Sequence, residues 1–155
     1  MFTGFRSLES ELFGVVDRMI RDGRTTKTQR HERFWLPTPP ARTEAAFRVH
    51  KTLGPGLLES VYERCLRREL LSRGVAFQSQ LALPVLYDGI SIEAGLRVDM
   101  IVDGRIIVEL KAAEVMHPIY TAQLLTYLKL TGLRLGLLIN FNVPLIRDGI
   151  RRIVL

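Results

Sequence analysis

The chain has 155 residues, 47% of them apolar, 25% charged and a net charge of +6, which fits one folded domain with a polyanionic partner. Its single cysteine excludes an internal disulfide and any zinc site built from several cysteines, and favours a reducing compartment. Because no run of about 18 apolar residues is present and charged residues interrupt the first sixteen positions, we expect a cytoplasmic protein without a membrane span or signal peptide.

The first forty residues differ in pattern from the rest of the chain. Residues 5–21 carry apolar side chains at helical spacing and predict an amphipathic helix, which offers one route to a homodimer. A polar, basic stretch with three prolines follows and is typical of a linker. We therefore interpret residues 1–40 as an extension and residues 41–155 as a single domain.

Two helices are predicted at the start of this domain. The first begins with Thr43 as N-cap and ends at a Gly-Pro-Gly turn, and its apolar face comprises Ala46, Phe47, Val49, His50 and Leu53. The second runs from about residue 57 to residue 73, with Gly74 past its end. Its predicted buried stripe comprises Leu58, Val61, Tyr62, Cys65, Leu66 and Leu70.

Strand patterns dominate the rest of the domain. Three segments, 75–89, 90–104 and 105–113, are separated by Asp-Gly dipeptides and predict an antiparallel meander. Pro118 then begins a helix through Leu130, and the almost wholly apolar segment 134–141 predicts a strand buried on both faces. The tail contains one more turn dipeptide and an edge strand. This order, helix, three strands, helix, strand, predicts an α/β fold.

Three charged residues interrupt the apolar pattern of neighbouring strands. Glu109 and Lys111 are two positions apart and therefore share one strand face, which we expect to open onto a cleft or water. Asp99 lies between two apolar residues of the preceding strand. Two carboxylates and an ammonium in this arrangement provide oxygen ligands for a hard cation such as Mg²⁺ and a positive charge near its bound water.

The length of the connecting loop decides whether the two carboxylates meet. A two-residue loop would set Asp99 opposite Val108 and leave Glu109 on the other face. A three-residue loop, 103–105, instead pairs Val102 with Ile106 and sets Asp99 opposite Glu109. We predict the three-residue loop or an equivalent bulge, because the metal-site hypothesis fails if the carboxylates lie on opposite faces.

Four segments resemble a known family. They are, in chain order, VHKTLGPGLLESVYE, RVDMIVDGRIIVELKA, AQLLTYLKLTGLRLGLLINF and RDGIRR. Together they resemble the GxxExxY protein family of the PD-(D/E)XK nuclease-like superfamily, over roughly residues 45–152. The resemblance implies an α/β fold with an αβββαβ core, in which helices flank a mixed central sheet.

The resemblance also implies roles for individual residues. Asp99, Glu109 and Lys111 correspond to the D, the (D/E) and the K of the superfamily motif, and Val98 replaces its proline. Glu59 matches a glutamate of the first core helix that helps hold the metal in many members. A QxxxY motif of the second core helix is matched by Gln123 and Tyr127.

The implied activity is metal-dependent hydrolysis of phosphodiester bonds in DNA or RNA. Mg²⁺ or Mn²⁺ would be held by the oxygen atoms of Glu59, Asp99, Glu109 and the Leu110 backbone. Lys111 would orient the attacking water or offset developing charge, and Gln123 and Tyr127 would brace the site or touch nucleic acid. Two alternatives are a catalytically silent module that binds nucleic acid or protein, and a structural adaptor that dimerises through the N-terminal helix.

Each candidate also has a purely structural interpretation. Glu109 and Lys111 could form an ion pair on an exposed strand, and the helix dipole favours Glu59 near a helix N-terminus without any function. Gln123 and Tyr127 could simply pack beside each other. For His50 and His117, which have no partner at metal-ligand spacing, we expect capping or packing roles.

Overall fold

A computed structural model describes residues 40–155, so the helix, linker and dimer contact predicted for residues 1–39 lie outside the described residues. The elements are α2 (Pro40–Leu53), α3 (Glu59–Ser72), β1 (Phe77–Tyr87), β2 (Ile90–Val102), β3 (Ile106–Lys111), α4 (Pro118–Thr131), β4 (Leu135–Asn140), α5 (Ile146–Gly149) and β5 (Ile150–Val154). Their order confirms the predicted succession of helix, three strands, helix and strand. Among the helices of residues 40–155, none combines the length and apolar character needed to span a bilayer.

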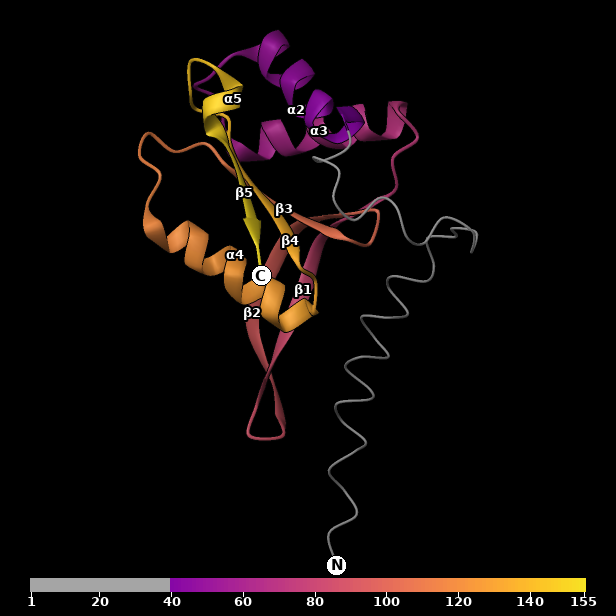
Figure 1. Cartoon of the computed structure of the whole chain (residues 1–155), viewed down its shortest axis with the longest axis vertical. Helices are drawn as coiled ribbons and strands as arrows, with labels where there is room; N and C mark the ends of the chain where they lie inside the picture. Colours follow the sequence, from indigo (N-terminus) through magenta and orange to yellow (C-terminus); the bar gives the residue numbers. More distant parts are fainter. Residues whose placement is uncertain (1–39) are drawn as a thin grey trace, which may run out of the picture.

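A single mixed sheet with the strand order β1-β2-β3-β4-β5 forms the centre of the domain. The first three strands are the predicted antiparallel meander, β3 and β4 run parallel, and β5 is an antiparallel edge strand. Helix α4 covers one face and helices α2, α3 and α5 gather toward the opposite side (Figure 1). The fold is therefore α/β with helices flanking a mixed sheet, as predicted.

Apolar side chains of the central strands enter two separate cores. Leu137 and Ile139 belong to the core with α2 and α3, whereas Leu138 belongs to the core with α4. This alternation confirms that β4 is buried on both faces, because both surfaces of a parallel strand pair are covered by helices.

Both predicted ends of α4 and the predicted end of α2 at the Gly-Pro-Gly turn were correct, whereas the predicted start of α2 was wrong. Pro118 occupies the first turn of α4 and Gly132 ends it in the left-handed region, with φ of 70°. Helix α2 begins at Pro40, so Thr43 lies inside the helix and is not its N-cap. Proline is favoured at the first helical position because its missing N–H has no partner there, which explains the earlier start.

The predicted apolar faces of α2 and α3 were too wide. Leu58 precedes α3 and is 74% exposed, and Phe47, Leu53 and Val61 are also exposed. The residues of these helices that are buried in the core are Ala45, Ala46, Val49, Tyr62, Leu66 and Leu70. A helix that contacts a sheet along a narrow line buries only part of its apolar stripe, and the remainder is left on the surface.

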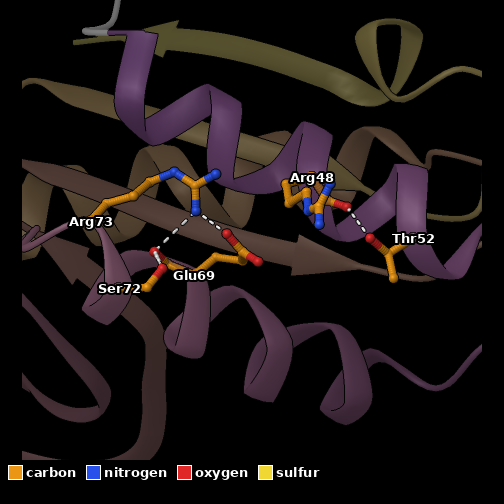
Figure 2. A network of polar contacts seen from close by, with 5 residues as sticks. All are labelled: Arg48, Thr52, Glu69, Ser72 and Arg73. Carbon is orange, nitrogen blue, oxygen red and sulfur yellow. Dashed lines mark hydrogen bonds and ion pairs between the residues drawn. The ribbon is translucent and has the colours of Figure 1, made fainter.

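Polar contacts hold the ends of these two helices. In the last turn of α3, the Arg73 guanidinium donates to the Glu69 carbonyl at 3.1 Å and forms an ion pair with the Glu69 carboxylate (Figure 2). On α2, the Thr52 hydroxyl donates to the Arg48 carbonyl at 2.9 Å. In both helices the side chains donate to backbone carbonyls near the C-terminal end, where carbonyls lack N–H partners within the helix.

The last Asp-Gly pair leads from a one-turn helix into the predicted edge strand β5. Asp148 and Gly149 end the helix α5, in which the Asp148 N–H donates to the Leu145 carbonyl at 3.0 Å. Gly149 lies so close to β4 that a Cβ added there would be 2.1 Å from the Asn140 carbonyl oxygen. The glycine is thus required by a close approach between backbones.

Candidate active site

The β2–β3 hairpin has the register that brings the two carboxylates together. Val102 pairs with Ile106 and Met100 pairs with Val108, so the loop contains residues 103–105. Asp103 and Gly104 take φ of 51° and 62°, a left-handed conformation that aspartate and glycine tolerate better than most residues. The predicted three-residue loop is confirmed.

Beyond the last regular pair, side chains replace the backbone bonds between the strands. The Leu110 N–H donates to Asp99 Oδ2 at 2.8 Å, and the Asp99 N–H donates to Glu109 Oε1 at 3.2 Å. Each carboxylate therefore accepts a hydrogen bond from the opposite strand. This reciprocal pair fixes both acidic side chains beside the backbone of Leu110.

Lys111 lies against the same pair. Its Nζ is 3.6 Å from Glu109 Oε2 and 5.4 Å from the centre of the Tyr120 ring. The side chains of Lys111 and Glu109 form the ion pair of the structural interpretation, but they are only 13% and 3% exposed, so the strand is not an exposed one. Of the expectation that this face opens onto a cleft or water, the part about water is wrong for Glu109, which is 2% exposed.

Glu59 reaches this cluster from the first residue of α3. Partial burial raises the pKa of its carboxyl group, with Lys111 lowering it and Asp99 raising it. A hydrogen bond from the Ala112 backbone also lowers this pKa, which places Glu59 next to the end of β3. The structure thus places Glu59 near Lys111 and Asp99, beside the end of β3.

Tyr62 holds the loop that leads into α3. As predicted, the residue is buried, and its ring stacks on Phe141 with centres 4.5 Å apart. Its hydroxyl donates to the Gly54 carbonyl at 2.6 Å and accepts from the Leu57 N–H at 3.1 Å. One buried side chain thus holds two points of the loop that leads to Glu59.

Burial and mutual repulsion act most strongly on Glu109. Loss of hydration and, after it, the nearby charge of Asp99 raise its pKa to about 8, and Lys111 opposes both effects. Within residues 40–155, no three His, Cys, Asp or Glu side chains form a ready set of metal ligands. The chemistry of the donors nevertheless fits Mg²⁺ or Mn²⁺, since these ions prefer carboxylate and carbonyl oxygens and would relieve the repulsion between the acids.

Gln123 and Tyr127 are bonded to each other. The Gln123 side-chain amide donates to the Tyr127 hydroxyl at 2.8 Å across one turn of α4. Tyr127 is 2% exposed and belongs to the core beneath that helix. Its burial favours a bracing role over direct contact with nucleic acid.

The histidines among the described residues, His50 and His117, are not in the acidic pair. His50 Nε2 lies 2.8 Å from the Val143 carbonyl and joins α2 to the segment after β4, which agrees with the expected packing role. His117 is the exposed N-cap residue of α4 and its side chain makes no capping hydrogen bond. Its ring meets Tyr120 edge-on, with centres 6.4 Å apart.

Asn140 was missed by the reasoning from sequence. Its buried side chain donates to the Ala113 carbonyl at 2.8 Å and accepts from the N–H groups of Ala113 and Asn142, both at 3.1 Å. The Phe141 N–H also donates to the Lys111 carbonyl at 2.8 Å. These bonds hold the backbone that follows Lys111. The available signal was a polar residue at the end of an otherwise apolar strand.

Comparison with known proteins identifies the family. A family model described as the PD-(D/E)XK nuclease superfamily matches residues 41–153. The chain belongs to the PD-(D/E)XK nuclease superfamily. Searches of curated proteins and of solved structures found no significant match. Membership in this superfamily agrees with the five-stranded mixed sheet and its flanking helices, and it indicates a nuclease-like function with a nucleic-acid substrate.

The raised pKa of Glu109 predicts how the metal-free protein responds to pH. The folded chain retains a proton on Glu109 up to about pH 8, whereas an unfolded glutamate loses it near pH 4.5. The free energy of unfolding should therefore fall as pH rises between these values. Asp99 increases the cost of ionising Glu109 and Lys111 reduces it, and the raised pKa of Glu59 acts on stability in the same direction. Urea unfolding in EDTA at several pH values measures the trend.

Glu109→Gln should flatten this pH dependence and make the metal-free protein more stable at pH 8 by about 1–3 kcal/mol, since no buried charge has to form. Glu93→Gln, at an exposed position of β2, is the matched control and should retain the wild-type trend. If the free energy of unfolding of the wild type instead increased from pH 4.5 to about pH 8, the raised pKa of Glu109 would be contradicted.

Proposed function

We propose that the protein is a metal-dependent nuclease of the GxxExxY family that hydrolyses phosphodiester bonds in DNA or RNA. The observation that carries this proposal is the meeting of Asp99, Glu109 and Lys111 at the end of one hairpin. A buried acid held beside a second, half-buried acid is costly for folding. Their retention is explained if a divalent cation and a phosphate group are to be bound there.

The carboxylates of Asp99, Glu109 and Glu59 and the Leu110 carbonyl would hold the metal. When bound, Mg²⁺ or Mn²⁺ supplies polarisation of the phosphodiester and a lowered pKa of coordinated water. The Asp99 carboxylate is already oriented for this role, because its Oδ2 atom accepts a hydrogen bond from the Leu110 N–H. Glu109 must lose its proton first, which the positive charge of a cation favours.

Lys111 would act on the reacting phosphate. Its ammonium is held between the Glu109 carboxylate and the Tyr120 ring. From this position it orients the attacking water or offsets the negative charge that develops on the phosphate oxygens. Gln123 and Tyr127 brace α4 behind the site, and Asn140 fixes the backbone after Lys111.

The second candidate is a nucleic-acid-binding module without turnover. It is favoured by one observation, that the acids are already satisfied by backbone N–H groups and by Lys111 without any metal. Such a module would bind nucleic acid equally well in EDTA and would lose affinity when surface arginines are removed.

A cleavage assay distinguishes the two functions. Wild-type protein is incubated with single- and double-stranded DNA and RNA in Mg²⁺, in Mn²⁺ and in EDTA, and the products are separated on denaturing gels. Lys111→Ala is compared with Lys129→Ala, a control at an exposed position of α4. A nuclease should cleave at least one substrate with metal, and only Lys111→Ala should be impaired. If no substrate is cleaved with either metal, the proposed activity is withdrawn.

A further inference from the structure

A groove lies between the second half of α2 and the segment that carries α5. Its volume is about 580 Å³, and its walls include Phe47, Arg48 and Lys51 on one side and Leu145 and Arg147 on the other. The Gly-Pro turn after α2 forms one end of the groove. It is thus a surface feature separate from the buried carboxylates.

The charges that line the groove have one sign. Arg48, Lys51 and Arg147 are exposed, and no acidic residue is among the described residues that line it. Arg147 lies 3.6 Å from Asp148, but both side chains are well exposed and a pair of this kind contributes little. A row of cations along a concave surface is suited to a polyanion.

Apolar side chains lie between these cations. Phe47 is 44% exposed and Leu145 is 50% exposed, although both are large hydrophobic residues. An exposed aromatic ring among basic side chains is the combination that binds single-stranded nucleic acid, because every base has a face that stacks on a ring. A duplex, whose bases are already stacked, gains nothing from Phe47.

Two short stretches of chain connect residues that line the groove with residues of the carboxylate cluster. Pro55 at its end is four residues before Glu59, and Pro144 in its wall is three residues after Phe141, which is bonded to Lys111. Figure 1 shows the start of α3, the end of α2 and α5 at the same end of the molecule. A strand lying in the groove would therefore lead toward the carboxylates.

We propose that this groove binds unpaired nucleotides of a single-stranded nucleic acid, with a base stacked on Phe47 and phosphates beside Arg48, Lys51 and Arg147. This inference rests on the proposed function and adds the substrate class, a single strand or a duplex with a single-stranded end. Bound there, one part of the strand is anchored while a neighbouring phosphodiester reaches Asp99 and Glu109.

The test measures binding separately from cleavage. Fluorescence anisotropy is recorded in EDTA with a labelled single-stranded oligonucleotide and with the duplex of the same sequence. Phe47→Ala should weaken binding of the single strand about ten-fold or more and leave duplex binding unchanged. Phe47→Trp should retain the single-strand affinity, which also shows that the position tolerates substitution.

The cations are tested as a pair. Arg48→Ala/Lys51→Ala should weaken single-strand binding. It should also make the plot of log affinity against log salt less steep, by the amount that about two phosphate contacts contribute. Arg105→Ala/Lys129→Ala removes two exposed charges outside the groove and should change the affinity less. Circular dichroism and thermal melting verify that each variant is folded.

The outcomes separate this inference from the proposed activity. If the groove variants bind a single strand as wild type does, or if wild type binds none, the groove assignment is wrong even where cleavage occurs. If Phe47→Ala weakens duplex binding to the same extent, the preference for single strands is wrong. Normal groove-dependent binding without cleavage in any metal would support the groove and overturn the nuclease activity.

Discussion

Replacing Asp99 or Glu109 by its amide should lower the rate of metal-dependent cleavage about 10³-fold or more, equivalent to about 4 kcal/mol of transition-state stabilisation. Asparagine and glutamine keep an oxygen that can accept the Leu110 and Asp99 N–H bonds, so the hairpin is preserved. What they remove is the negative charge that would bind the cation in the proposed function. Single-turnover cleavage at saturating Mg²⁺ or Mn²⁺ measures the effect.

The matched control for these amides is Glu93→Gln, which removes an acid from an exposed position of β2. Its cleavage rate should equal that of wild type. Binding of nucleic acid by the Asp99 and Glu109 variants should be retained in EDTA. Retention of cleavage within ten-fold of wild type by both amide variants would place the chemistry elsewhere in the molecule.

Gly149→Ala should destabilise the fold by about 3 kcal/mol or more. The added Cβ would lie 2.1 Å from the Asn140 carbonyl oxygen and 2.9 Å from Val143 Cγ2. One of these neighbours is backbone of the end of β4, which cannot move without disturbing the bonds that Asn140 makes to Ala113. Urea denaturation gives the loss in free energy of unfolding.

Gly89→Ala separates this steric effect from the cost of backbone conformation. Gly89 has φ of 75° and no atom within 4 Å of an added Cβ, so only the left-handed conformation is penalised. Its cost should be about 1 kcal/mol. Equal losses in the two variants would show that the close approach of α5 to β4 is not needed for stability.

The parts of the site that are predictable from sequence are those encoded within short segments. Glu109 and Lys111 disrupt an apolar strand at a spacing that fixes their common face, and the dipeptide Asp103-Gly104 marks the turn. The requirement that Asp99 meet Glu109 then selects the three-residue loop, which the pairing of Val102 with Ile106 confirms. The α/β order follows from the same local patterns.

Other features depend on contacts between segments that are distant in the sequence, and the spacing of apolar residues within one segment does not predict such contacts. Asn140 bonds to a residue 27 positions away, and Gly149 is required by the carbonyl of that same asparagine. Phe47 has helical spacing with the buried residues of α2 yet is exposed, because the width of a buried stripe depends on what the helix packs against. The burial of Lys111 beside Tyr120 likewise results from the placement of α4.

The acidic pair has a consequence for the order of folding. Asp99 and Glu109 are about ten residues apart along one hairpin, whereas the bond from His50 to Val143 spans 93 residues. Local pairs of this kind form within microseconds, before distant segments have met. The two carboxylates therefore come together while still hydrated, and the cost of burying them falls on the later docking of α3 and α4. The slowest steps of assembly are in this way the ones that a bound cation or proton would most assist.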